Sequence, residues 1–330
     1  MSLVPAIAAL CVVLCAFGLS TWLASSRSPV KILDHPNDRS LHSKPTPRTG
    51  GLAIVLTVAV CWALLAWLVD VPPQMGSLAL AALAVAAISL ADDVVQVGSA
   101  LRFFVHAASA GLLCWAGLAL SWPWVGVIVS LLFIVWMINL YNFMDGMDGF
   151  AGGMTFFGFG VMALAGWLAG DTLFAAFCGA PALASLGFLA VNFPPAKIFM
   201  GDVGSATLGL LAAAFSLWGI ELGLFTLWFA LLIFSPFTVD ATVTLLRRMA
   251  RREKFWQAHR SHYYQRLVQM GWSHRKTVLC EYALMAAAGG LGLLLLEHPH
   301  YVIAAAVAWT VILGAIMWGV DRRWARQQSR

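Results

Sequence analysis

Charged residues are scarce in this sequence. It has 20 Lys and Arg and 15 Asp and Glu among 330 residues, or 11%, whereas soluble globular domains carry about 25%. Hydrophobic residues make up 61% of the chain, and the mean hydropathy is +0.83. This composition excludes a soluble globular enzyme, a disordered protein and a collagen-like fibre. It indicates an integral membrane protein with many spans.

Cysteine motifs are absent as well. No Cys-x-x-Cys pair occurs, and all six cysteines lie within apolar stretches: Cys11, Cys15, Cys61, Cys114, Cys178 and Cys280. We therefore expect no disulfide framework and no zinc site, and we interpret the cysteines as small buried hydrophobic residues. The net charge of +5 does not indicate a nucleic-acid partner, because the basic residues flank apolar spans, as they do in the cytoplasmic loops of membrane proteins.

Long apolar runs, by contrast, are abundant. A spanning helix needs roughly 20 apolar residues, and this rule predicts about eleven spans in one all-α polytopic domain over residues 1–330. They are expected near residues 3–26, 50–70, 76–92, 102–120, 123–141, 152–169, 172–191, 204–220, 223–246, 277–296 and 301–320. No basic residue precedes the first run, so we expect a retained helix with its N-terminus outside the cytoplasm rather than a signal peptide.

The basic residues are confined to a few places. The longest polar segments, 27–49 and 247–276, hold most of them, and the others are Arg102, Lys197 and the arginines of the C-terminal tail. If the spans alternate as predicted, all twenty lie on one side of the membrane, which is the bias of cytoplasmic loops. The inference depends on the span count, since one miscounted span would divide the basic residues between the two sides.

Two adjacent carboxylates, Asp92 and Asp93, end the third predicted span. Neighbouring carboxylates at a membrane boundary repel each other and resist desolvation. A polar helix terminus in water is one interpretation, although a single Asp would mark that end equally well. We favour a pair that handles a metal ion or a phosphate.

A second acidic motif follows the fifth predicted span. Asn142, Asp145 and Asp148 are spaced three residues apart, and a helical turn would place them on one face. The glycines beside them would let the backbone approach a ligand closely. A glycine-rich turn between spans accounts for the glycines but not for two acids beside an apolar span.

A third polar run separates the seventh and eighth predicted spans. It extends from Asn192 to Ser205 and contains Phe199 and Asp202. Capping of the next helix accounts for Asp202, but not for the rest of the run. The sequence therefore predicts a third part of the same site here.

Two basic segments complete the set of motifs. The loop 247–276 contains His259, Arg260 and His262 among its arginines, and the segment 34–51 mixes prolines and paired glycines with Lys44 and Arg48. Topology signalling or contact with anionic lipid accounts for the arginines but poorly for the histidines.

All five motifs fall on the predicted cytoplasmic face. Mg²⁺ prefers one or two carboxylates together with substrate phosphate oxygens, and basic side chains suit phosphate charge. Together the motifs predict a site at which a soluble, phosphate-bearing substrate meets a membrane-embedded one.

These segments resemble the polyprenyl-phosphate N-acetylhexosamine-1-phosphate transferase family, glycosyltransferase family 4. Asp92–Asp93, the run Asn142–Gly149 and the run Phe199–Ser205 occur in the family's order, and the resemblance extends from about Asp34 to the region of Arg266. It implies transfer of a sugar-1-phosphate from a UDP-N-acetylhexosamine to undecaprenyl phosphate, with Mg²⁺ as cofactor and Mn²⁺ as a substitute. It also implies a homodimer in the bacterial inner membrane whose active site faces the cytoplasm.

The resemblance further implies a role for each matched residue. The catalytic residues would be Asp92, Asp93, Asp148 and His262. The metal ligands would be Asp202, Asp92 and Asp148. The substrate-binding residues would be Asn142, Asp145, Asn192, Phe199, Arg102, Arg48, Lys44, Arg260 and His259, of which Asn192 and Phe199 resemble positions that hold the uracil and stack on it.

The sequence departs from the family in one place. The family's loop usually carries tandem histidines, whereas here His262 is followed by Tyr263 and Tyr264. This argues against the peptidoglycan enzyme. The variant looks more like the O-antigen initiating transferases of pseudomonads, which act in lipopolysaccharide synthesis on sugars such as FucNAc or QuiNAc.

Two alternatives remain open at this stage. Direct displacement by the lipid phosphate is the favoured mechanism, and a phospho-aspartyl intermediate on Asp93 or Asp92 is its rival. The alternative function is a secondary transporter or a lipid-linked sugar flippase. Transporters place ionisable residues near the membrane midplane, and only Asp240, Glu281 and His106 lie well inside the predicted spans.

Overall fold

The computed structural model describes residues 3–30, 32–36, 41, 44–254 and 259–329. Asn37, Asp38, Arg39 and His42 of the basic segment 34–51 lie outside the described residues. The helices are α1 Val4–Ala24, α2 Gly50–Leu68, α3 Gln74–Val95, α4 Ser99–Trp115, α5 Pro123–Met144, α6 Phe150–Leu168, α7 Thr172–Asn192, α8 Gly201–Glu221, α9 Leu227–Ile233, α10 Ser235–Ala250, α11 Tyr263–Gln269, α12 His274–Glu297 and α13 Val302–Gln328. A short 3-10 helix, Pro299–Tyr301, precedes α13, and two short strands, β1 Leu33–Asp34 and β2 Thr46–Pro47, pair antiparallel.

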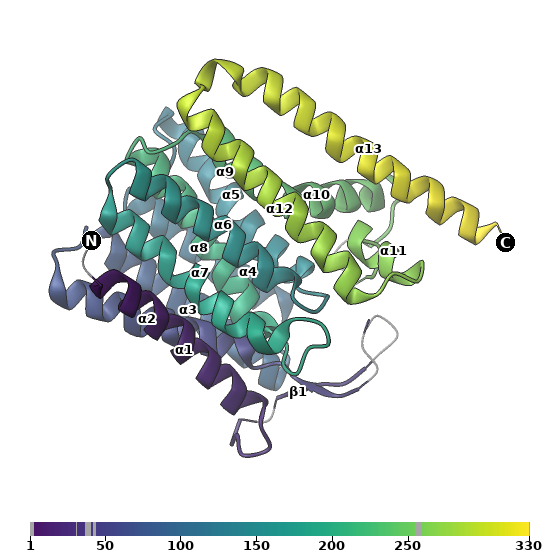
Figure 1. Cartoon of the computed structure of the whole chain (residues 1–330), viewed down its shortest axis with the longest axis horizontal. Helices are drawn as coiled ribbons and strands as arrows, with labels where there is room; N and C mark the ends of the chain where they lie inside the picture. Colours follow the sequence, from purple (N-terminus) through teal and green to yellow (C-terminus); the bar gives the residue numbers. More distant parts are fainter. Residues whose placement is uncertain (1–2, 31, 37–40, 42–43, 255–258, 330) are drawn as a thin grey trace.

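The prediction of an all-α, multi-pass membrane protein is confirmed. In the described residues, nine helices are long and apolar enough to cross a membrane, or ten if α9 and α10 count as one bent span. Figure 1 shows these helices running side by side in a bundle, with β1, α11 and the C-terminal end of α13 toward one end of it. We call this the polar end; it carries the loops 145–149 and 193–200.

Two of the eleven predicted spans differ from the prediction. The span predicted at 102–120 is α4, which has 17 residues and is therefore only about 25 Å long. It ends early because Gly117 adopts a left-handed conformation, with φ +96°.

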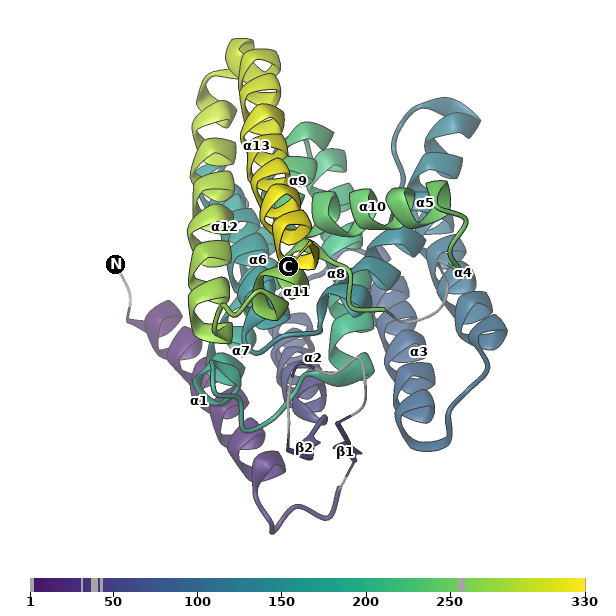
Figure 2. The ribbon, with the colours of Figure 1, turned by 90° about the vertical axis from the view of Figure 1, so that its right-hand side faces the viewer.

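The span predicted at 223–246 is not a straight helix. It consists of α9 and α10, which meet at 80°, and Figure 2 shows α10 running across the neighbouring helices. Pro236 at the start of α10 explains the break, because proline lacks an N–H and fixes its φ, so it begins a helix well but cannot continue one. The run of apolar residues predicted the length of this segment but not its direction.

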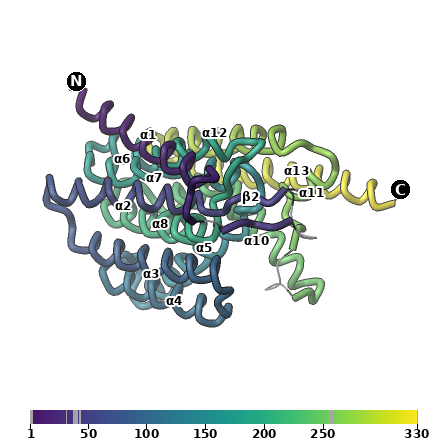
Figure 3. Tube along the Cα trace, turned by 90° about the horizontal axis from the view of Figure 1, so that it is seen from below, coloured from purple at the N-terminus to yellow at the C-terminus, as the bar shows by residue number. Residues whose placement is uncertain are grey.

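Helix α8 forms the centre of the bundle. It is 94% buried over its apolar window, compared with 17% for α1 and 11% for the α13 region. Figure 3 shows the layers around it, with α3 and α4 at one edge and α12 and α13 at the opposite one. Gly204 and Gly209 bring α8 into backbone contact with α2 and α5, respectively. Because α8 has Asp202 in its first turn, the most buried of the described spanning helices positions that carboxylate.

The close contact between α8 and α5 leads to a stability prediction. A Cβ atom on residue 209 would collide with the carbonyl oxygen of Met137 and lie 2.8 Å from Cα of Ile138, and backbone cannot move aside easily. We expect Gly209→Ala to destabilise the protein by about 1–3 kcal/mol, seen as a lower Tm in detergent. Gly111→Ala is the control, since no heavy atom lies within 4 Å of the added carbon. An equal Tm for both variants would contradict the packing described.

Candidate active site

Four carboxylates gather at the polar end, and we call them the acidic cluster: Asp92, Asp93, Asp145 and Asp202. The first two end α3, Asp145 directly follows α5, and Asp202 is the second residue of α8. Their charges act on one another: Asp202 interacts with Asp92, Asp93 and Asp145. The structure thus brings together acids that the sequence placed in three separate motifs.

Two arginines neutralise part of this charge. Arg48 Nη2 lies 3.3 Å from Asp93 Oδ1 and donates to the Asp93 carbonyl oxygen at 2.9 Å. Arg102 Nη1 bonds Asp92 Oδ2 at 2.5 Å and lies 3.6 Å from Asp202 Oδ2. The Asp93 carboxylate is buried, and the Val203 backbone N–H interacts with it in addition to Arg48. Four carboxylates thus face two guanidinium groups, which leaves an excess of negative charge.

Asn142 and Gly201 fix Asp202 in the cluster. Asn142 Nδ2 donates to Ser205 Oγ at 3.3 Å, and its side chain also hydrogen-bonds Asp202. Gly201 has φ +74°, and any side chain there would collide with the Arg48 carbonyl oxygen. Glycine is therefore required at this position, because it lets α8 begin directly against the backbone that carries Arg48.

Asp145 is the member of the cluster that lies in a loop. Burial raises the pKa of its carboxyl well above the ordinary value, and the nearby charge of Asp202 raises it further, together with Asp93 and Asp34. The cluster therefore favours protonated Asp145 unless a cation approaches it.

This pKa leads to a prediction about stability and pH. An acid whose pKa is raised on folding stabilises the fold below its unfolded pKa, about 3.9, and this stabilisation is lost as the pH rises through the folded pKa. At pH 8 in buffer without divalent cations, Asp145→Asn is expected to raise the Tm by roughly 2–4 °C. At pH 5 the gain should shrink.

The control for this prediction is Asp70→Asn, which changes an exposed aspartate in the loop between α2 and α3. Adding Mg²⁺ should raise the Tm of the wild type more than that of Asp145→Asn. A Tm for Asp145→Asn below that of the wild type at pH 8 would contradict the account of the cluster.

Asp148 lies in a second group, apart from Asn142 and Asp145. Its Oδ2 accepts the Ala196 N–H at 3.0 Å and lies 3.3 Å from His274 Nδ1. Burial alone would raise the pKa of Asp148, but the bonds from His274 and Ala196 outweigh it and lower the pKa.

The prediction that one helical face carries Asn142, Asp145 and Asp148 is therefore wrong. The helix α5 ends at Met144, and Gly149 takes φ +73°. The chain thus turns after Asp145 and carries Asp148 toward the α7–α8 loop.

Asn192 and Phe199 hold the α7–α8 loop in place. Asn192 Oδ1 accepts the Gly149 N–H at 2.9 Å, and its Nδ2 donates to the Ile198 carbonyl at 2.8 Å. The backbone of Phe199 bonds Pro47 and Gly50 at 2.7 and 2.9 Å. Both ends of the Asn192 amide thus support neighbouring backbone, and the contact of these two residues with uracil stays a prediction.

The two histidines of the basic loop lie together. The rings of His259 and His262 are 4.8 Å apart, and His262 Nδ1 lies 3.3 Å from Asp240 Oδ1. Burial, and then the charge of His262, lowers the pKa of His259 to about 4. Its Nδ1 is 2.9 Å from Ser261 Oγ. Since its pKa lies this low, His259 is uncharged at neutral pH.

Lys44 and Arg260 are exposed on loops of the polar end. The backbone of each residue accepts a hydrogen bond from a nearby side chain: the Lys44 carbonyl from the Thr46 hydroxyl, and the Arg260 carbonyl from the Gln269 amide. Their charged ends face solvent, where a phosphate could reach them, and their roles in binding stay predictions.

The acidic cluster suits a divalent cation that completes its shell with substrate oxygens. Among the described residues, no three His, Cys, Asp or Glu side chains are arranged to hold a metal ion, so the predicted ligands Asp92, Asp148 and Asp202 do not form a complete site. The excess of carboxyl groups over guanidinium groups in the cluster nevertheless fits Mg²⁺, which needs only one or two protein carboxylates.

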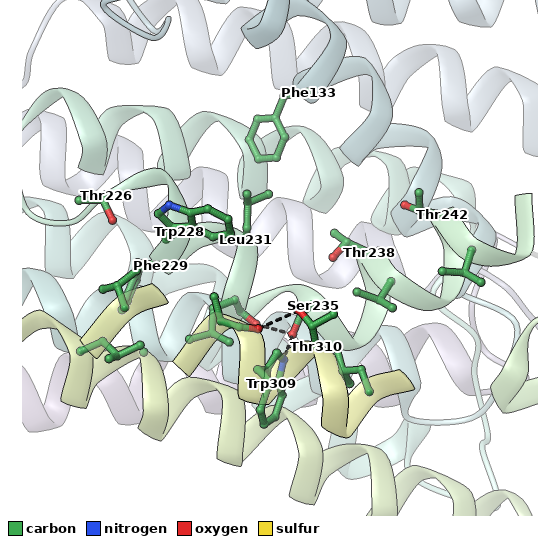
Figure 4. Close-up of a pocket in the computed structure, with 18 of the residues that line it drawn as sticks. Phe133, Thr226, Trp228, Phe229, Leu231, Ser235, Thr238, Thr242, Trp309 and Thr310 are labelled. Atoms are coloured by element: carbon green, nitrogen blue, oxygen red, sulfur yellow. Dashed lines mark hydrogen bonds between the residues drawn. The ribbon is translucent and has the colours of Figure 1, made fainter. Parts of the chain in front are cut away.

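An apolar groove of about 420 Å³ lies between α5, α9, α10, α12 and α13. Figure 4 shows Phe133, Thr238 and Trp309 around it, with Trp309 Nε1 donating to Ser235 Oγ at 2.8 Å. Trp136, also in its wall, precedes Asn142 on α5 by six residues, or about 9 Å. A second apolar groove of about 340 Å³ lies between α2, α3, α7 and α8.

Sequence reasoning missed several residues of this region. Asp34 contributes charge next to Asp145, His274 pairs with Asp148, and Asp240 pairs with His262. Asp240 was visible as an acid inside a predicted span. Asp34 lay in the predicted segment 34–51 and His274 in the loop 247–276, but neither could be paired from the sequence, because their partners lie more than 100 residues away.

The comparisons with known proteins agree with this geometry. The glycosyl transferase family 4 model matches residues 75–220, a stretch that contains the whole acidic cluster. The chain is 30% identical over 274 residues to a probable undecaprenyl-phosphate N-acetylglucosaminyl 1-phosphate transferase of Bacillus subtilis, which covers 78% of this chain and 76% of the relative. The chain belongs to glycosyl transferase family 4.

Other members of glycosyl transferase family 4 are similar over much the same length. A decaprenyl-phosphate N-acetylglucosaminephosphotransferase of Mycolicibacterium smegmatis is 30% identical over 75% of this chain and 71% of its own. A phospho-N-acetylmuramoyl-pentapeptide-transferase of Staphylococcus aureus is 27% identical over 77% of this chain and 86% of its own. The predicted family is confirmed, whereas the closeness to pseudomonad O-antigen enzymes stays a prediction.

Proposed function

We propose that this protein transfers N-acetylhexosamine-1-phosphate from a UDP-sugar to undecaprenyl phosphate. The products are undecaprenyl-diphosphate-sugar and UMP. The observation that carries this proposal is the acidic cluster with its two arginines, because it lies at the end of an apolar bundle where a soluble and a membrane substrate can meet. The printed names of the relatives from Bacillus and Mycolicibacterium support a polyprenyl-phosphate acceptor and an N-acetylglucosamine-type sugar.

The reaction is a single displacement at phosphorus. An oxygen of the lipid phosphate attacks the phosphorus that bears the sugar and forms a new P–O bond. The bond from that phosphorus to the bridging oxygen breaks, and UMP leaves with the electron pair. Since the lipid phosphate is already ionised at neutral pH, positioning contributes more than proton removal.

The residues of the cluster have distinct roles in this scheme. Arg102 and Arg48 hold phosphate oxygens and orient them. Asp202 and Asp92 would hold Mg²⁺, for which Mn²⁺ would be the substitute, and the ion would neutralise charge on the leaving phosphate. Asn142 keeps Asp202 in place through its hydrogen bond.

The lipid chain lies in the apolar groove between α5 and α13. The lining there is mostly apolar, and α13 is the least buried of the described spanning segments, so a lipid can enter from the membrane. Two of its lining residues, Phe133 and Trp136, lie on α5, the helix that also carries Asn142, so in this proposal the phosphate at the head of the chain lies beyond that wall, toward the acidic cluster.

The location follows from the charge pattern. The basic residues gather at the polar end, and basic loops are typical of the cytoplasmic side, so we infer that the protein lies in the bacterial inner membrane with its active site facing the cytoplasm. This transfer would be the first membrane step of the synthesis of O-antigen, lipopolysaccharide or another cell-surface polysaccharide.

A transfer assay separates this enzyme from a transporter or flippase. Purified protein is incubated with undecaprenyl phosphate and UDP-N-acetylglucosamine carrying a labelled sugar, and butanol-extractable label is counted. We expect label in the lipid fraction, its loss on chelation of divalent cations, and its return with Mg²⁺. Parallel reactions with UDP-FucNAc and UDP-QuiNAc identify the preferred sugar. No labelled lipid with any of the three donors would overturn the proposal.

A further inference from the structure

Tyr263 and Tyr264 follow His262 in the loop where glycosyl transferase family 4 usually carries tandem histidines. They begin α11, directly after His262, and consecutive helical residues point about 100° apart. Tyr263 faces α13, where its hydroxyl contacts Asp321 at 3.2 Å. Tyr264 instead faces the core and is fully buried. The two tyrosines thus serve different neighbours.

Asp240 holds the start of α11 in place. Its carboxylate accepts the backbone N–H groups of Tyr263 and Tyr264 at 3.0 and 3.2 Å and the Thr244 hydroxyl at 3.1 Å. His262 Nδ1 lies 3.3 Å from the same carboxylate. A carboxylate is favourable at a helix N-terminus, and these donors offset its burial. The position of Tyr264 is therefore fixed relative to α10.

The phenol of Tyr264 lies against the turn that carries Asp145. Its ring packs on Phe150 with centroids 4.6 Å apart. Its buried hydroxyl interacts with the Gly146 backbone N–H and with the Gln265 side chain. A Cβ atom on residue 146 would collide with this hydroxyl. Burial, with Asp240 and Asp145 nearby, raises the pKa of the Tyr264 phenol well above its usual value, so the hydroxyl keeps its proton.

We propose that Tyr264 is a positioning residue for the turn 145–149, and that Asp240 holds Tyr264 for this purpose. Its hydroxyl sets where Gly146 lies and thereby holds Asp145 beside Asp202. Tyr264 contacts no substrate in this proposal, which rests on the proposed function for its kinetic consequences.

Gly146→Ala, alone and combined with Tyr264→Phe, tests this contact. Gly146 is not in the left-handed conformation, so alanine suits its backbone, and the collision with the hydroxyl is the main obstacle to it. With that oxygen removed, the nearest atoms to the new methyl group would be Gln265 Nε2 at 3.2 Å and Tyr264 Cζ at 3.6 Å. The double variant should therefore relieve the displacement that Gly146→Ala causes alone.

The kinetic readout is the split between kcat and KM. A displacement near 1 Å at a reacting centre can lower rates by about 10²-fold, so we expect Gly146→Ala to lower kcat by about that factor, with little change in KM for undecaprenyl phosphate. The double variant should recover most of this loss. Tyr263→Phe is the matched control and should keep nearly wild-type kcat, since Tyr263 faces α13.

Hydrogen exchange of the turn 145–149 gives a readout that does not depend on turnover. We expect faster exchange in Gly146→Ala and a return toward wild-type exchange in the double variant. If exchange follows this order among the three proteins but the wild type transfers no sugar phosphate, the proposed function is refuted and this inference still holds. A double variant no better than Gly146→Ala in kcat and in exchange, or a fully active Gly146→Ala, would overturn the inference.

Discussion

Asp202→Asn is expected to lower the turnover of purified protein by about 10³-fold, the upper range for loss of one preorganised charge in an active site. Asp202 lies where Asn142, Arg102 and the rest of the acidic cluster meet. Asparagine keeps the shape but removes the charge that would hold Mg²⁺. Initial rates with UDP-N-acetylglucosamine and undecaprenyl phosphate measure the effect.

The control for this variant comes from the same helix. Glu221 is exposed at the opposite end of α8, and Glu221→Gln should keep the wild-type rate. The Tm of Asp202→Asn should be no lower than that of the wild type, because the change removes one of four crowded carboxylates. Near wild-type turnover in Asp202→Asn would remove Asp202 from the site.

Arg102→Met is expected to reduce kcat by about 10²-fold and to raise the KM for the UDP-sugar. Arg102 is the cation shared by Asp92 and Asp202, so its loss leaves two carboxylates to repel each other and removes a phosphate contact. The kcat of Arg102→Lys should lie between those of the wild type and Arg102→Met, because lysine restores the charge but not the planar guanidinium fork.

Arg323→Met is the matched control for this prediction. Arg323 is exposed near the end of α13, more than 100 residues after Asp202 in the sequence. Its replacement should leave kcat and the KM for the UDP-sugar unchanged. If Arg102→Met retained both kcat and the KM for the donor, the arginine would have no part in phosphate binding.

Much of this fold could be predicted from apolar length alone. Nine of the eleven expected spans correspond to helices long enough to cross a membrane, because a spanning segment must satisfy its own backbone hydrogen bonds. The direction of a segment is not encoded in its length, and the bend before α10 was therefore missed. Pro236 was its visible sign.

The acidic cluster was predictable in part. Asp92, Asp93, Asp145 and Asp202 stood out because charge is rare in an apolar chain, and the structure brings them together. The prediction from the three-residue spacing was wrong for Asp148, because it required α5 to continue beyond Met144, where the helix ends. The glycines at 146 and 149 were evidence that it ends.

The contacts that hold the site together could not be predicted from the sequence. Asp240 bonds residues more than 20 positions away, and Arg48 pairs with Asp93 across 45 positions. Such pairs depend on how the helices pack, which hydrophobic periodicity does not specify in a chain whose helices are apolar on all sides. The role proposed for Tyr264 likewise depends on the packing of α11 against the turn 145–149, which the sequence does not specify.

The most direct test of the central claim is to follow the phosphate itself. UDP-N-acetylglucosamine labelled with ³²P on the phosphate that bears the sugar is incubated with purified protein and undecaprenyl phosphate, and the lipid and nucleotide products are separated. The account predicts that the ³²P enters the lipid fraction and that unlabelled UMP is released in equal amount. Release of ³²P-labelled UDP, with the sugar alone joined to the lipid, would contradict it.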